Sequence, residues 1–302
     1  MNLKRISDFS FLMTKTKTTK TAIISILKKL TNHDYIEIVT RGNSAISSAL
    51  ALVPKNKKIL IPEEGGWLHY RTAPKQLGLE ADEVKCQDAK INLQDLETKL
   101  STKQFSALLY QNPGGYFAEQ PGKEIYQLCK KNNCLIILDV SGSIGTRLAD
   151  GKYADIIIGS FGTWKLVEAK VGGFISSNDQ KLWKKIKFEK LENEADLSNI
   201  LQQLEKLPQR ISYLKNIRNK IIHDLDKLSA PNKNLSNPNK FSIVHKNDLG
   251  FVVIVKFTAP QEKETIINYC KNNKLEYTEC PRYIRLNQKA ISIEVKRLLQ
   301  QN

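Results

Sequence analysis

The chain has 302 residues, with an apolar fraction of 41% and a charged fraction of 26%, as expected for a soluble protein with one large and one smaller domain. No run approaches the ~20 apolar residues of a membrane-spanning helix, and the N-terminus lacks a signal-peptide core. We therefore expect a cytoplasmic protein with no membrane partner. The net charge of +16 comes from lysines spread along the whole chain without an aromatic-interleaved basic motif, so we expect no specific nucleic-acid partner.

The cysteines argue against two further classes of protein. There are five, an odd number, and none has CxxC spacing, while the four histidines are scattered. A disulfide scaffold and a zinc site are both disfavoured, and we expect no metal. Cys280 lies near a predicted active-site strand and is retained as a candidate reactive thiol.

In chain order, short and nearly continuous apolar runs alternate with segments of helical periodicity as far as residue 177. Such runs predict strands that are buried on both faces of a sheet, and the segments between them predict helical crossovers. Helices are expected at residues 21–30 and 122–131. Strands are expected at residues 36–39, 58–61, 107–110, 135–139, 156–159 and 173–176, with a weaker one at 83–86. The predicted fold class is α/β, with a mainly parallel seven-stranded sheet.

The pattern changes after residue 177. Residues 182–228 are charged and periodic and lack strand signals, which predicts a long helix with further helical turns, and residues 230–240 predict a linker. The last elements are expected to be strands at 241–245, 251–257 and 283–287 and helices at 261–273 and 291–300. We place the large domain at residues 1–180, and the long helix with a small α+β domain at residues 181–302.

Two residues carry the main chemical hypothesis. Asp139 ends one predicted buried strand, and Lys165 follows the next strand. An enzyme that uses pyridoxal 5'-phosphate needs a lysine to form a Schiff base and a carboxylate to keep the pyridine nitrogen protonated. The alternative for Asp139 is a helix cap or an ion pair with Arg147. Lys165 is preferred to Lys170, which lies too close to the following strand.

A phosphate site is predicted after the first strand. Gly42 allows the backbone to approach an anion, Asn43 and Ser44 supply polar groups, and the helix that begins here adds partial positive charge. Ser160 could complete this site. The alternative is an ordinary strand-to-helix turn with a polar cap.

Two further residues follow the carboxyl ends of predicted strands. Trp67 could stack on the cofactor ring, and the alternative is an indole that packs under a glycine-rich loop. The amide of Asn112 could bind the ring hydroxyl of the cofactor, although Asn before Pro-Gly is also a common turn.

Taken together, these residues resemble the fold-type I pyridoxal phosphate enzymes, and among them the DegT/DnrJ/EryC1/StrS aminotransferases. The resemblance covers residues 35–177, and its centre is similar to that family's Ser-Phe-x-x-x-Lys run (residues 160–165) and glycine pair (172–173). It implies a set of cofactor contacts: Lys165 for the Schiff base, Asp139 for the pyridine nitrogen, Trp67 for the ring, and Asn43, Ser44 and Ser160 for the phosphate.

The chain departs from this family at one position of the expected site. Members usually carry a glutamine three residues after the aspartate, where this chain has Gly142. Ser141 or Asn112 would then have to serve the ring hydroxyl. In the tail, the segment around Arg285 resembles the strand whose arginine binds a substrate α-carboxylate in many fold-type I enzymes, because a guanidinium pairs with a carboxylate through two bonds. The alternative for Arg285 is a surface arginine on an edge strand.

The sequence therefore predicts an aminotransferase that takes an amino-acid donor through an internal aldimine at Lys165. The resemblance implies a homodimer with shared active sites. A lyase or desulfurase that acts on a cysteine-like amino acid is an alternative, with Cys280 as its candidate nucleophile. A catalytically degenerate paralogue that binds a ligand or partner is another. A basic RNA-associated protein has only the charge in its favour.

Overall fold

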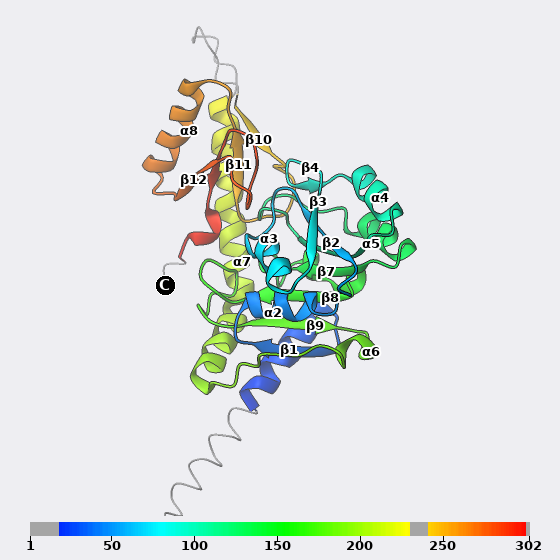
Figure 1. The fold of residues 1–302 in the computed structure, drawn as a ribbon. Coiled ribbons are helices and arrows are strands. Elements are labelled where there is room, and N and C mark those ends of the chain that lie inside the picture. The colour runs from blue at the N-terminus through cyan, green and yellow to red at the C-terminus, as the bar shows by residue number, and fades with distance from the viewer. Residues whose placement is uncertain (1–17, 230–240, 300–302) are drawn as a thin grey trace, which may run out of the picture.

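The computed structural model of the protein describes residues 18–229 and 241–299 (Figure 1). The large domain is built on a seven-stranded sheet with the strand order β1-β9-β8-β7-β6-β2-β3. Its strands are β1 (Tyr35–Val39), β2 (Lys58–Pro62), β3 (Glu80–Val84), β6 (Phe105–Gln111), β7 (Leu135–Asp139), β8 (Ile156–Ser160) and β9 (Gly173–Ser177). Strand β9 runs antiparallel to both of its neighbours, and the other adjacent pairs are parallel. The predicted α/β class and the mainly parallel seven-stranded sheet are confirmed.

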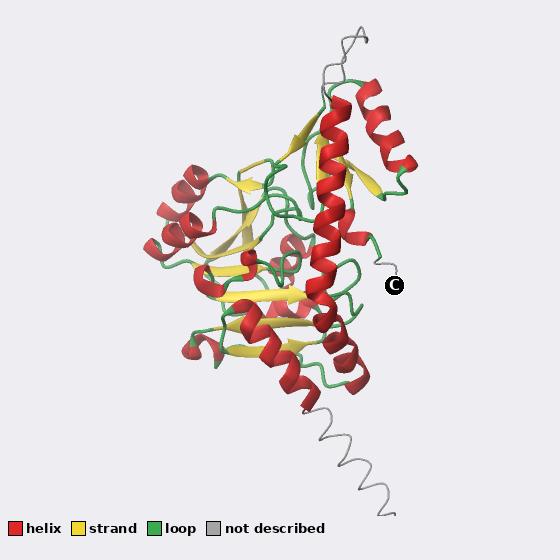
Figure 2. Cartoon of the chain, turned by 180° about the vertical axis from the view of Figure 1, so that it is seen from behind, coloured by secondary structure: helices red, strands yellow, loops and turns green. Residues whose placement is uncertain are grey.

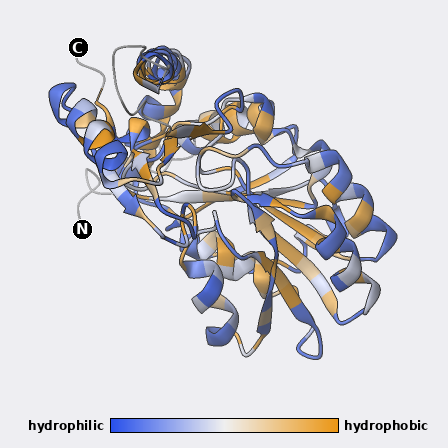
Figure 3. Cartoon of the chain, turned by 90° about the horizontal axis from the view of Figure 1, so that it is seen from above, coloured by the Kyte–Doolittle hydropathy of each residue, from blue (hydrophilic) through white to orange (hydrophobic). Residues whose placement is uncertain are grey.

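Helices cover both faces of this sheet, so the large domain has three layers (Figures 1 and 2). One face packs against α2 (Gly42–Leu50), α3 (His69–Gln76) and α6 (Gln180–Trp183). The opposite face packs against the helix at residues 18–31, α4 (Leu93–Ser101), α5 (Gly122–Lys131) and α7 (Glu194–Ser229). Successive residues of a strand point to opposite faces, so each strand supplies side chains to both apolar layers. The strands are drawn mainly in hydrophobic colours between helices with hydrophilic outer faces (Figure 3).

The small domain is a four-stranded antiparallel sheet with one covering helix. Its strands lie in the order β10-β11-β13-β12. They are β10 (Ser242–Val244), β11 (Val253–Lys256), β12 (Tyr277–Cys280) and β13 (Ala290–Ile293), accompanied by α8 (Pro260–Asn272) and the short η3 (Val295–Arg297). Helix α7, with 36 residues, contributes to one apolar cluster that includes side chains of both sheets. The domain boundary after residue 180 stays a prediction.

Two predictions for the small domain are wrong. The predicted strand at 283–287 is a loop, and it docks on the large domain: the Gly65 amide donates to the Tyr283 carbonyl oxygen at 2.7 Å, and the Asn287 amide donates to Glu64 at 2.8 Å. The predicted helix at 291–300 is instead the strand β13 followed by η3. The sequence there alternates too briefly to separate a strand from a helix, and pairing on both edges of β13 decides the outcome.

Three smaller differences complete the comparison. The weak strand predicted at 83–86 is β3, at residues 80–84. The predicted long helix is divided into the short α6 and the long α7. The strand β12, the hairpin of β4 (Cys86–Gln87) and β5 (Lys90–Ile91), and the short helices η1 (Arg147–Ala149) and η2 (Gly151–Tyr153) were not predicted. The linker predicted at 230–240 lies outside the described residues. Within the described ranges, no helix combines the length and the apolar character needed to cross a membrane.

Candidate active site

A cavity of about 360 Å³ lies where the parallel strands of the large sheet end. This edge is where open α/β sheets bind ligands, because the loops that follow the strands converge there. Seven of the residues predicted for the site line the cavity: Gly42, Asn43, Trp67, Asp139, Ser141, Ser160 and Lys165. They come from the ends of four different strands, so the fold assembles a site that is dispersed along the sequence.

Asp139 is a buried carboxylate with neutral partners. Its Oδ2 accepts a hydrogen bond from the Tyr70 hydroxyl at 2.7 Å, and its Oδ1 accepts one from the Ser141 amide at 2.8 Å. Burial, together with the neighbouring Asp139, raises the pKa of Tyr70 well above its ordinary value, so this phenol stays a hydrogen-bond donor. The alternative ion pair with Arg147 is absent, because Arg147 pairs with Glu119 at 2.5 Å.

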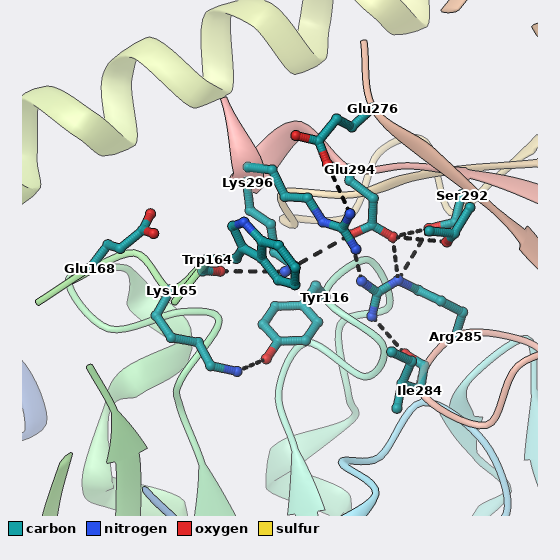
Figure 4. Close-up of polar contacts among 12 residues, drawn as sticks. Tyr116, Trp164, Lys165, Glu168, Glu276, Ile284, Arg285, Ser292, Glu294 and Lys296 are labelled. Atoms are coloured by element: carbon teal, nitrogen blue, oxygen red, sulfur yellow. Dashed lines mark hydrogen bonds and ion pairs between the residues drawn. The ribbon is translucent and has the colours of Figure 1, made fainter. Parts of the chain in front are cut away.

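Lys165 lies between two aromatic rings. Its ammonium nitrogen is 4.9 Å from the ring centroid of Trp67 and 5.0 Å from that of Tyr116, and it forms a hydrogen bond with the Tyr116 hydroxyl (Figure 4). The indole of Trp67 is fixed in turn, because its Nε1 donates to Asn43 Oδ1 at 3.1 Å. The lysine is therefore directed by its neighbours at the cavity wall. Lys170, the rival lysine, also lines the cavity.

One end of the cavity is suited to an anion. Helix α2 begins at Gly42 with no acidic residue in its first turn, so its amide groups and dipole favour negative charge. A Cβ at Gly42 would lie 2.5 Å from the Cβ of Ser160, so only glycine fits this close approach. The side chains of Arg41 and Lys170 add two cations to the same cavity wall. The sequence analysis did not identify Arg41 as a site residue.

Two predicted cofactor contacts do not line the cavity. The Ser44 hydroxyl donates to Glu189 at 2.8 Å and pairs with Thr40, so the helix turns it away from the anion end. The side-chain oxygen of Asn112 accepts from the Gln120 amide at 3.1 Å. Both side chains bond other parts of the chain, although Ser44 does not cap helix α2 as the alternative interpretation expected.

Arg285 is also placed differently from the prediction. It is 1% exposed and does not line the cavity, because the predicted strand is a loop folded inward. Its guanidinium bonds Glu294 at 2.6 Å, Ser292 at 3.1 Å and the Ile284 carbonyl oxygen at 2.8 Å (Figure 4). A substrate carboxylate would have to displace Glu294 to bind it. The alternative of a surface arginine does not hold either.

A buried ionic cluster surrounds Arg285. Burial alone would raise the pKa of Glu294, but Arg285, Lys296 and Arg297 together lower it to about 2. Burial, followed by repulsion from Arg285, lowers the pKa of Lys296 well below its ordinary value. The Lys296 amine donates to the carbonyl oxygen of Trp164 at 3.3 Å, next to Lys165 (Figure 4). The sequence analysis did not predict this cluster. Its one sign in the sequence is Glu294, a glutamate inside an apolar run.

Two other functional candidates were missed. They are Tyr116, which touches Lys165, and Gln111, which ends β6 beside Asp139. Tyr70, which holds Asp139, was considered only as an alternative stacking or acid/base group. Tyr70 and Gln111 follow strand ends in the sequence or lie on them, which is a usable signal. Tyr116 lies on a turn, and only the folded loop brings it to the lysine.

The cavity meets the chemical requirements of pyridoxal phosphate. The cofactor needs an amine for its aldehyde, an acceptor for its ring nitrogen and a pocket for its phosphate. Lys165 would supply the amine, Asp139 the acceptor, and the glycine-lined end with Ser160 the anion pocket.

Two family models match the chain. Residues 81–196 match the model of the DegT/DnrJ/EryC1/StrS aminotransferase family, and residues 201–302 match that of the MJ1341 family C-terminal domain. The predicted resemblance is confirmed. No curated protein matches the chain in a sequence search.

Solved structures share the fold at low identity. The Helicobacter pylori aminotransferase PseC, involved in pseudoaminic acid biosynthesis, is 15% identical with a TM-score of 0.72, covering 91% of this chain and 85% of that one. The histidinol-phosphate aminotransferase of Clostridium acetobutylicum is 14% identical with a TM-score of 0.68, covering 91% and 84%. 3-Amino-5-hydroxybenzoic acid synthase is 12% identical with a TM-score of 0.70, covering 93% of this chain and 85% of that one. These structures confirm the predicted fold, and the family match supports the predicted class, a pyridoxal phosphate-dependent transferase.

Proposed function

We propose that the protein is an aminotransferase that takes its amino group from an amino acid and binds pyridoxal phosphate covalently at Lys165. One observation carries the proposal. Lys165 and the buried carboxylate of Asp139 line the same cavity, whose opposite end is built for an anion. A structural role would need only one of these features, whereas the cofactor uses all three.

The residues of the cavity divide the chemistry between them. The bound cofactor supplies an electron sink for the bond that breaks at the substrate Cα. Asp139, oriented by hydrogen bonds from Tyr70 and the Ser141 amide, would accept a hydrogen bond from the protonated ring nitrogen. Lys165, once an incoming amine has released it, takes the proton from Cα as a general base. Trp67 lies beside the lysine amine at the cavity wall.

The anion end orients the cofactor. Gly42, Ser160 and the start of α2 would bind the phosphate through backbone and hydroxyl groups, with Arg41 and Lys170 adding charge. Holding the phosphate fixes the ring between Asp139 and Lys165, which is what a proton transfer at a defined atom requires.

The competing functions are less well supported. A desulfurase needs a mobile nucleophilic thiol, but Cys280 is 6% exposed and burial raises its pKa above the ordinary value. A catalytically inactive binding protein would have no need of a lysine in a cavity beside a buried carboxylate. The predicted homodimer, the cytoplasmic location and the amino-acid donor remain part of the proposal, and a role for Arg285 in substrate binding would require release of Glu294.

The decisive experiment compares wild type with Lys165→Ala and, as a matched control, Lys296→Ala. We expect wild type to bind pyridoxal phosphate in a yellow form that borohydride fixes to Lys165, as shown by peptide mapping. Lys165→Ala should lose the covalent bond and reduce amino transfer by about 10³-fold or more, because it removes both the covalent anchor and the base.

Lys296→Ala should keep the covalent bond, because its amine faces Trp164 and lies outside the cavity. Labelling of Lys170 or Lys296 in wild type would refute the assignment of Lys165. Wild type that binds the cofactor but transfers no amino group from any amino acid would point to the inactive binding protein.

A further inference from the structure

Gln111 carries a polar group that the folded chain leaves without a partner. It is the last residue of β6 and 2% exposed, and its side-chain Nε2 has no hydrogen-bond partner among the described residues. Buried polar groups are nearly always paired, because a donor removed from water without a replacement costs free energy. An orphaned amide beside an active site therefore indicates a missing ligand atom.

The sheet places this amide beside Asp139, a residue that lines the cavity. Gln111 is the register partner of Asp139 on the adjacent parallel strand β7. Side chains alternate along a strand, so Gln111 shares a face with Ala107 and Leu109, which pack in the layer that contains α2 and α3. Asp139 points to the same layer, where Tyr70 of α3 binds it. The two side chains thus lie side by side at the end of the sheet.

Gly142 lies next to both Gln111 and Tyr116, and Tyr116 in turn bonds Lys165. A Cβ at Gly142 would lie 3.2 Å from Gln111 Nε2 and 2.5 Å from Cδ1 of Tyr116. Any side chain at this position would therefore displace the ring of Tyr116, whose hydroxyl bonds Lys165. Because position 142 has no side chain, Gln111 and Tyr116 both fit beside it. Gln111 is next to Asp139, and Tyr116 is next to Lys165.

We propose that Gln111 donates a hydrogen bond from Nε2 to the ring hydroxyl of bound pyridoxal phosphate. The inference rests on the proposed function, and it assigns to β6 the amide that the family pattern places at position 142. The ring hydroxyl lies next to the carbon that bears the aldehyde, and so on the side of Lys165. With the ring nitrogen at Asp139, a donor that neighbours both Asp139 and Tyr116 would lie on the side of this hydroxyl. The side-chain oxygen of Asn112, the other candidate amide, accepts a hydrogen bond from the backbone amide of Gln120.

The test uses two buried glutamines with opposite bonding. Gln111 has an unpartnered Nε2, whereas Nε2 of Gln120 donates to the carbonyl oxygens of Ala89 at 2.7 Å and Ala118 at 3.1 Å. Gln111→Met and Gln120→Met are compared with wild type by thermal melting without cofactor, and by equilibrium dialysis and melting with pyridoxal phosphate.

Gln111→Met should melt at or above the wild-type temperature without cofactor, because it removes an unsatisfied donor. It should bind pyridoxal phosphate about tenfold more weakly and gain less melting temperature from it. Gln120→Met should melt lower without cofactor and keep wild-type affinity. Gln111→Leu repeats the test with a different shape.

Three results would overturn the inference. Loss of apo-protein stability in both Gln111 variants would show that the amide has an internal partner. Wild-type affinity in these variants would show that it does not contact the cofactor. Weaker binding in Tyr116→Phe but not in Gln111→Met would assign the hydroxyl to the phenol. If wild type itself does not bind pyridoxal phosphate, the proposed function fails, and the inference with it.

Discussion

Two buried carboxylates, one in each domain, are compensated in opposite ways. Glu294 lies among Arg285, Lys296 and Arg297, which pair its charge completely within the chain. Asp139 is held by the neutral donors of Tyr70 and Ser141, and in the described part of the chain no cation forms an ion pair with it. A buried charge without a counter-charge is unfavourable unless something else supplies one. Glu294 therefore belongs to a structural ionic cluster, whereas Asp139 belongs to a site suited to a cationic ligand group.

Asp139→Asn should give the largest effect on activity. We expect amino transfer to fall by about 10²- to 10⁴-fold while cofactor binding persists, because the ring nitrogen loses the charge that keeps it protonated. The stability of the cofactor-free protein should hold or rise slightly, since an unpaired buried charge is removed. Activity assays and urea denaturation measure the two quantities. A strongly destabilised variant would mean that Asp139 serves the fold in the way Glu294 does.

Glu294→Gln should show the reverse pattern, a loss of stability with the cofactor attachment retained. The carboxylate has a pKa of about 2 in the folded chain, below its ordinary 4.5, and the difference corresponds to about 3 kcal/mol of stability. Unfolding by urea at neutral pH should reveal a loss of this order, while covalent attachment of the cofactor to Lys165 is retained.

The pH dependence of this loss follows from the direction of the shift. As pH falls, the unfolded chain takes up the proton first, so the stabilisation is complete above about pH 5 and disappears as pH approaches about 2. Wild type and Glu294→Gln should therefore converge in acid. A difference that stays constant down to pH 2 would contradict the ionic origin.

The smallest expected effect is the difference in pyridoxal phosphate affinity between Ser160→Ala and Ser44→Ala. Ser160 lines the anion end of the cavity, and its loss should weaken pyridoxal phosphate binding by about tenfold, the effect of one hydrogen bond to a charged group. Ser44 is occupied by Glu189, so its loss should leave the affinity within about twofold of wild type. Equilibrium dialysis resolves the two. Equal losses would show that Ser44 turns toward the phosphate when the cofactor binds.

The sequence predicted the large domain well for a physical reason. Strands buried on both faces appear in the sequence as apolar runs. The order of these strands in the sheet brings Asp139, Lys165, Trp67 and Gly42 to one edge. The direction of single side chains was less predictable. Ser44 bonds the distant Glu189 and Asn112 bonds the backbone of Gln120, and Gln111 points inward because of strand alternation that a short run does not reveal.

The small domain was harder to predict because tertiary contacts decide its elements. β13 is fixed by strands on both edges, and the loop that carries Arg285 is fixed by hydrogen bonds to the loop after β2. Tyr116 escaped prediction for a similar reason, since only the folded turn places its hydroxyl at Lys165.

The residue before the lysine links the two domains. Trp164 has a φ of +61°, a conformation that costs a non-glycine residue about 1–2 kcal/mol. The Lys296 amine binds its carbonyl oxygen, and the Arg297 guanidinium lies 4.2 Å from the centroid of its ring. Residues 296 and 297 thus help to hold the backbone from which the lysine extends. In evolution, an exchange of the C-terminal domain between relatives would alter the catalytic loop as well, so position 164 and positions 296–297 should be inherited as a unit.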